Sequence, residues 1–128
     1  MGTITVVTDR KRQVVDITDD VQRGVSIKNG IIHLFAQHTT VALTVADLDP
    51  GTDLDMLDAF ETIVPKLAYR HPHDPAHVPD HILSAMIGVS LVIPVRDGAL
   101  QLGTWQRIIL IEFSEPRERT IAVSEIEG

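Results

Sequence analysis

Short apolar runs rich in β-branched residues alternate with polar turn segments along most of the chain. Strands favour β-branched side chains, whereas turns favour Gly, Pro, Asp and Asn, so each run predicts a strand. The predicted strands cover residues 3–7, 13–17, 31–37, 41–45, 89–95, 100–102, 106–113 and 120–123. In the second half, Asp97-Gly98 predicts a tight hairpin turn. The pattern is therefore that of a protein built mainly of strands.

Three other segments carry the capping and spacing signals of helices. The first begins at Thr18-Asp19-Asp20 and ends near Asn29-Gly30. The second covers Thr52 to Val64, where apolar residues recur every three or four positions. The third begins at Pro79, a residue favoured in the first turn, and stops at Gly88. Strands combined with two or three helices predict an α+β fold, with residues 1–128 as a single domain.

Length and composition narrow the functional classes. A chain of 128 residues with 44% apolar residues has the size and core of one domain. It has no cysteine, so any metal must be held by His, Asp or Glu. The net charge of −7 disfavours nucleic-acid binding. The apolar run at 108–111 is far too short to span a membrane, and the first residues lack a secretory pattern, so a cytoplasmic location is expected.

His38-Thr39-Thr40 lies at the junction of two predicted strands, where a bend would direct polar side chains to one place. An imidazole and two hydroxyl groups can bind a metal, relay a proton or hold a phosphate. The alternative is a strand-end histidine that only bonds to nearby backbone. His33 lies five positions earlier, so it points to the other face of the strand.

Residues 69–80 form a predicted loop rich in His and Pro. His71, His73 and His77 lie in this loop, and His81 falls in the first turn of the third predicted helix. Histidines from separate elements can converge on a metal, but solvent-facing histidines without a role are common in such loops. No HExxH spacing is present, so local spacing alone does not predict a metal.

An acidic run and a tryptophan motif offer further polar groups. Asp55 and Asp58 share a face of the second predicted helix and can hold Mg²⁺, although a solvated acidic face is the favoured interpretation. Trp105 is predicted to cap the core, and the adjacent Gln106 can bond to a ligand.

Two arginines follow Pro116 near the C-terminus. Arg117 and Arg119 would point the same way if this segment is a strand, and paired guanidinium groups match a phosphate. The alternative is pairing of these arginines with Glu112 or Glu115.

Taken together, the motifs resemble the YjbQ family. The resemblance rests on His38-Thr39-Thr40, Asp49-Pro50, Asp55-Met56, the run from Pro79 to Gly88, the run from Gly98 to Gln106, and Glu112 with Pro116-Arg117 and Arg119. It implies an α+β fold built as a sandwich on a large, mainly antiparallel sheet, and assembly as a homotrimer. The histidines that match the family pattern are His38, His71 and His81.

Members of that family are described as secondary thiamine-phosphate synthases, which implies a transferase that joins a pyrimidine pyrophosphate to a thiazole phosphate. The implied partner is a small phosphorylated molecule, and a divalent metal, Zn²⁺ or Mg²⁺, would assist the departing pyrophosphate. The implied catalytic residues are His38, His81 and Asp55, and the implied metal ligands are His38, His71 and His81. The residues implied to bind the substrate are Thr39, Thr40, Gln106, Arg117 and Arg119. Two alternatives stay open: a metal-dependent hydrolase of a small phosphorylated or acylated compound, and a non-catalytic trimer that binds a small ligand or a metal.

Overall fold

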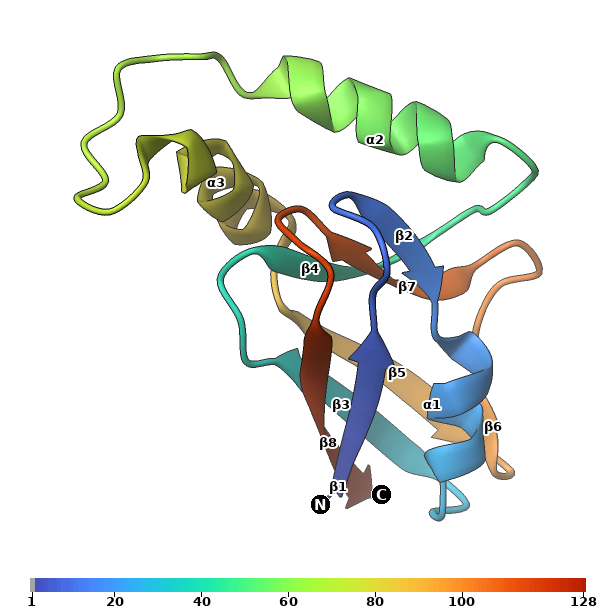
Figure 1. The fold of residues 1–128 in the computed structure, drawn as a ribbon. Coiled ribbons are helices and arrows are strands. Elements are labelled where there is room, and N and C mark those ends of the chain that lie inside the picture. Colours follow the sequence, from blue (N-terminus) through green and yellow to red (C-terminus); the bar gives the residue numbers. More distant parts are fainter. Residues whose placement is uncertain (1) are drawn as a thin grey trace.

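The strands of the computed structural model, which describes residues 2–128, form two antiparallel sheets (Figure 1). Five strands pair in the order β1-β8-β3-β5-β6, and three in the order β2-β7-β4. The strands are β1 (Gly2–Val7), β2 (Gln13–Asp16), β3 (Gly30–Ala36), β4 (Val41–Ala46), β5 (Ser90–Arg96), β6 (Ala99–Leu100), β7 (Arg107–Glu112) and β8 (Glu118–Glu127). The α+β fold and its mainly antiparallel sheets are confirmed. The strand β8 extends well beyond the predicted 120–123, because it pairs along both β1 and β3.

The helices are α1 (Thr18–Gly24), α2 (Thr52–Ile63) and α3 (Val78–Ile87), with a short 3₁₀ turn, η1 (Pro75–His77), before α3. The predictions for α2 and α3 are confirmed to within one residue at each end. The prediction for the first helix is wrong at its C-terminus, since α1 ends at Gly24 and Val25 is already extended (ψ 121°). Glycine is a weak helix former, and it stops this helix early.

The strand β7 is buried on both faces and defines three layers. Ile108 and Leu110 face the core between the two sheets, whereas Ile109 and Ile111 face the helices. The run at 108–111 therefore lacks polar alternation because both of its faces are covered. Helices α2 and α3 pack over β2 and β4 on the outer side of the three-stranded sheet, as Figure 1 shows.

The connection between β3 and β4 crosses from one sheet to the other, and α3 ends beside it (Figure 1). Gly88 ends α3 with a φ of 104°, a conformation that favours glycine, and its carbonyl accepts the Leu43 N–H of β4 at 2.9 Å. This hydrogen bond fixes the end of α3 against the strand that follows His38-Thr39-Thr40. Within residues 2–128, no helix combines the length and the apolar character needed to cross a membrane.

Candidate functional site

The crossover between β3 and β4 bends at Thr39 and Thr40, as the sequence predicted, and holds His38 between the Thr120 backbone and the Arg119 guanidinium. His38 Nε2 accepts the backbone N–H of Thr120 at 2.9 Å, and Nδ1 lies 3.3 Å from Nη1 of Arg119. A neutral imidazole has one lone pair, so with Nε2 accepting from Thr120 the proton lies on Nδ1, and Arg119 is a nearby cation rather than a second donor to the ring. Burial, followed by repulsion from Arg119 and Arg117, accordingly lowers the pKa of His38, although Glu112 opposes the shift. His38 is a neutral, well-held ring.

Arg119 and Glu112 form a buried ion pair behind His38. Their side chains are 1% and 0% exposed, and the guanidinium contacts both carboxylate oxygens, with Nε 2.7 Å from Oε1. Thr8 donates its hydroxyl to the same carboxylate at 2.8 Å, and Arg119 donates to Thr40 Oγ1 at 3.1 Å. For Arg119, the structure therefore shows pairing with Glu112, which was the alternative to phosphate binding. Arg119 reaches the candidate site only through His38 and Thr40.

Arg117 lies in a different environment. Its side chain is exposed and pairs with Glu115 at 2.9 Å. The condition for Arg117 and Arg119 to point the same way is not met, because β8 begins at Glu118 and Arg117 therefore lies before the strand. Only Arg117 presents its guanidinium to solvent, where an anion can displace Glu115 at small cost.

His81 and His71 stack beside the crossover, with ring centroids 5.3 Å apart and an interplanar angle of 11°. His81 Nδ1 lies 3.0 Å from the carbonyl oxygen of Thr39. A carbonyl only accepts, so Nδ1 carries the proton and the Nε2 lone pair of His81 has no partner among residues 2–128. Because the carbonyl fixes both the tautomer and the ring orientation, Nε2 of His81 is an oriented base or ligand.

His71 has the opposite tautomer. Its Nδ1 accepts the backbone N–H groups of His73 at 3.2 Å and Asp74 at 3.1 Å. The neutral ring must therefore carry its proton on Nε2, which makes His71 a donor. A base at His81 and a donor at His71 consequently lie side by side at the N-terminal end of α3.

These orientations bear on the expected metal site. Among residues 2–128, no three His, Asp or Glu side chains are gathered with the spacing of a metal site. Nε2 of His38 accepts the Thr120 N–H, and Nδ1 of His71 accepts two others. Within one chain, the side chains of His38, His71 and His81 do not fit a three-histidine cage. Nε2 of His81 is the one nitrogen of the three that is both oriented and available.

Two predicted site residues lie apart from the histidines. Asp55 is exposed in the first turn of α2, which lies across the molecule from the β3–β4 crossover (Figure 1). Gln106 closes its own turn, where its Oε1 accepts the Gly103 N–H at 2.8 Å. The prediction that Trp105 caps the core is wrong, because this turn carries the side chain outward and leaves it 71% exposed.

Asp80 is a buried group beside the histidines that the sequence did not single out. It lies 3.5 Å from the Arg12 guanidinium and is 3% exposed. Burial raises its pKa, and Arg12, the nearest cation, opposes this shift. In the sequence, Asp80 is marked only by its place in the first turn of a helix, where a carboxylate is favoured. An exposed carboxylate is equally favoured there, so the sequence could not show that Asp80 is buried.

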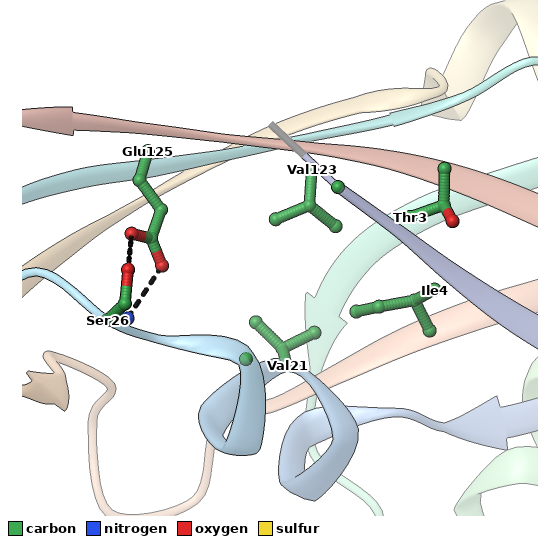
Figure 2. A pocket seen from close by; sticks show the side chains of 8 residues that line it. Thr3, Ile4, Val21, Ser26, Val123 and Glu125 are labelled. Atoms are coloured by element: carbon green, nitrogen blue, oxygen red, sulfur yellow. Dashed lines mark hydrogen bonds between the residues drawn. The ribbon is translucent and has the colours of Figure 1, made fainter.

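A separate hollow of about 280 Å³ lies between α1 and the paired strands β1 and β8 (Figure 2). Ile4, Val21 and Val123 line it with apolar groups. Both oxygens of Glu125 are occupied by Ser26, through its N–H at 2.8 Å and its hydroxyl at 2.5 Å. These hydrogen bonds lower the pKa of Glu125. Because both oxygens of Glu125 already accept hydrogen bonds from Ser26 and the other named lining residues are apolar, this hollow is a poor candidate for a catalytic site.

Comparisons with known proteins agree with the fold and the motifs. The model of the family described as UPF0047 protein YjbQ-like matches residues 2–128. A UPF0047 protein of Archaeoglobus fulgidus is 36% identical over 124 residues, covering 96% of this chain and 98% of the relative. The UPF0047 protein YjbQ of Salmonella typhimurium is 43% identical over 100 residues, covering 76% and 72%.

Solved structures show the same fold. A hypothetical protein from Aeropyrum pernix K1 superposes with a TM-score of 0.90 at 35% identity, covering 99% of this chain and 98% of that one. A YbjQ-like protein of unknown function from Sulfolobus solfataricus has a TM-score of 0.90 at 36% identity, covering 99% and 96%.

The geometry of His38 predicts a pH-dependent contribution to stability. Its folded-state pKa lies below the value of about 6.5 for an unfolded histidine. The unfolded chain therefore binds the proton first, so the stabilisation is complete above about pH 6.5 and is lost as pH falls through the folded pKa. The free energy of unfolding is measured with urea at several pH values between 7 and 5. The amount by which wild type exceeds His38→Gln should become smaller as the pH falls. A constant difference would contradict this, and His73→Gln controls for loss of an exposed histidine.

The buried ion pair predicts strong coupling between its partners. Glu112→Leu or Arg119→Met alone should lower the free energy of unfolding by about 3–5 kcal/mol, because each leaves a buried charge without its partner. The double variant should be more stable than either single variant. Denaturant titrations of the four proteins measure this coupling, and Glu112→Gln is a milder replacement if a single variant does not fold. Additive losses would contradict the assignment.

Proposed function

Because the chain belongs to the UPF0047 YjbQ-like family, we propose that it is an enzyme acting on a small phosphorylated molecule, with thiamine-phosphate synthase chemistry as the specific reaction. The observation that carries the proposal is the pairing of an oriented base, Nε2 of His81, with a donor, Nε2–H of His71. Such a pair can transfer protons at one site and bind a phosphate oxygen there. The fold holds both rings before any ligand arrives.

In this reaction, a ring nitrogen of the thiazole phosphate forms a bond to the methylene carbon of the pyrimidine pyrophosphate. The carbon–oxygen bond breaks, and pyrophosphate leaves with the electron pair. The protein has to stabilise the charge that develops on the leaving group. His71, the Thr39 hydroxyl and exposed Arg117 are the donors proposed for the phosphate oxygens, while His81 accepts a proton or an N–H from the substrate. Buried Arg119 positions His38 and Thr40.

A divalent metal is a further part of the proposal, and the chain restricts how it would bind. One available nitrogen, on His81, does not make a site, so further ligands would have to come from substrate phosphates or another copy of the chain. When bound, the ion would neutralise charge on the pyrophosphate. The roles given to the side chains above do not require it.

Hydrolysis is the second candidate reaction, and the same nitrogen favours it. An oriented imidazole lone pair can take a proton from water as readily as from an organic substrate. The two reactions differ in their requirements, since the transferase needs both organic substrates and the hydrolase needs one. A purely ligand-binding role differs from both in having no turnover.

Assembly as a homotrimer is also proposed, and the outer face of the five-stranded sheet supports it. Alternating residues point away from the core and leave Val7, Phe35, Val92 and Ile126 between 41% and 67% exposed. Helices α2 and α3 cover the other sheet instead. Exposed large apolar side chains on an uncovered sheet face favour contact with another protein surface. Thr120, which binds His38, also lies on β8, so assembly would occur close to the candidate site.

Replacing His81 tests the enzymatic proposal. The His81→Ala variant should lose about 100-fold or more in kcat/KM, because the oriented base is removed. His73→Ala, in the same loop but outside the pair, should retain activity. Pyrophosphate release is followed with both substrates together and with each alone, using protein dialysed against chelator and then reloaded with Zn²⁺ or Mg²⁺.

The outcomes separate the candidates. Turnover that requires both substrates supports the transferase, whereas phosphate or pyrophosphate release from one substrate supports the hydrolase. Binding without turnover in any metal state would exclude both enzymatic reactions and leave the binding role. Equal loss in His81→Ala and His73→Ala would contradict the assignment of the base.

The assembly proposal predicts a particle of three times the 14.1 kDa chain mass in light scattering after size exclusion. Val92→Lys should shift the protein toward the monomer, because it places a charge in the apolar face that would be buried. Leu54→Lys, which changes an exposed leucine on α2, should leave the mass unchanged. A monomeric wild-type protein would exclude the trimer.

A further inference from the structure

A cavity of about 620 Å³ lies beneath the connection between α2 and α3. Figure 1 shows this connection arching away from the sheets before it returns to α3. The walls come from the end of α2, the connecting segment, η1, the start of α3 and the turn between β1 and β2. Its volume falls within the range of small-molecule sites, which are generally concave and largely apolar.

The floor of the cavity belongs to the helix-side core. Val64 and Leu83 line it and are only 6% and 2% exposed. Phe60, another lining residue, packs edge-on against buried Phe113 with ring centroids 5.8 Å apart. A floor anchored in the core keeps its shape without a ligand, so little ordering free energy opposes binding.

The cavity and the histidine site lie on opposite sides of α3. Pro79 and Leu83 are four residues apart, so they share one face of the helix, and both line the cavity. His81 lies midway between them in sequence and points to the other side, where Nδ1 contacts the Thr39 carbonyl. The cavity is therefore a separate site that shares α3 with the first.

Arg12 supplies a cation that is only loosely held at the cavity. Its guanidinium lies 3.4 Å from Glu61 and 3.5 Å from Asp80, both long for charged pairs. The Asp80 side chain is 5% exposed and anchors the guanidinium, whereas Glu61 is 58% exposed. A ligand oxyanion can replace Glu61 without disturbing the buried carboxylate, since exposed ion pairs contribute little. Lys66 adds a second cation to the lining.

We infer that this cavity binds a small aromatic oxyanion, with its apolar body on Phe60 and Leu83 and its carboxylate or phosphate group against Arg12 and Lys66. The inference goes beyond the proposed function, because it concerns the face of α3 that does not carry His81. The apolar floor selects a flat or branched hydrophobic body. The two cations select against neutral and cationic molecules of the same shape.

The test compares two probes of matched shape, 1-naphthoate and neutral 1-naphthalenemethanol, by calorimetry on the full chain. Naphthoate should bind saturably and about tenfold or more tightly than the alcohol, because only the anion pairs with the guanidinium. Amide shifts in a ¹⁵N spectrum should map to the end of α2, η1 and the start of α3. Weaker binding at high salt is expected as well.

Variants then distinguish the contribution of the two cations to binding from that of the cavity volume. Lys66→Gln and Arg12→Gln should each weaken naphthoate binding and reduce its advantage over the alcohol, and Ala76→Phe, which fills the cavity, should weaken both probes. Lys28→Gln is the matched control, since Lys28 is an exposed lysine outside the cavity. If Arg12→Gln unfolds, Lys66→Gln and Ala76→Phe carry the test. Equal affinity of the two probes, shifts confined to the β3–β4 crossover, or an equal loss in Lys28→Gln would overturn the inference.

Discussion

The ion pair between Glu112 and Arg119 joins the two sheets where the candidate site lies. Glu112 ends β7 in the three-stranded sheet, and Arg119 belongs to β8 in the five-stranded sheet. Two buried charges are costly unless they are paired and fully hydrogen-bonded, which here fixes the position of each strand relative to the other. Arg119 also donates to Thr40 and lies beside His38, and Thr8 donates its hydroxyl to the Glu112 carboxylate. The constraint that closes the sandwich thus also holds the ring of His38 neutral.

The double burial of β7 explains why two distant parts of the chain meet at this end. The inner face of the strand closes the sandwich, and its outer face, with Ile109 and Ile111, gives α3 a surface to pack on. The end of α3 bonds to β4 through Gly88, and its start bonds to the crossover through His81. Held at both ends, the helix places His81 beside Thr39 although 42 residues separate them.

Local signals predicted the elements well because each is settled within a few residues. Asp97-Gly98 forms the expected hairpin turn with positive φ at both positions, and Gly88 ends α3 as expected. Where the outcome depends on tertiary packing, the sequence was silent or misleading. Spacing could not decide between a phosphate and Glu112 as the partner of Arg119, and Trp105 fits either a core or an exposed turn. The grouping of His38, His71 and His81 as one site came from a family resemblance, and their unequal tautomers depend on neighbours that only the fold supplies.

The neighbours of His38, His71 and His81 give these three identical side chains different hydrogen-bonding properties. The Thr120 N–H uses the lone pair at Nε2 of His38, the Thr39 carbonyl makes His81 an acceptor at Nε2, and two loop N–H groups make His71 a donor. A three-histidine metal site needs three available lone pairs, and those of His38 and His71 already accept N–H groups within the chain. The same α3 turn that presents His81 holds Asp80 against Arg12 on its other side. A ligand that displaces Glu61 from Arg12 therefore leaves the anchor of the helix in place.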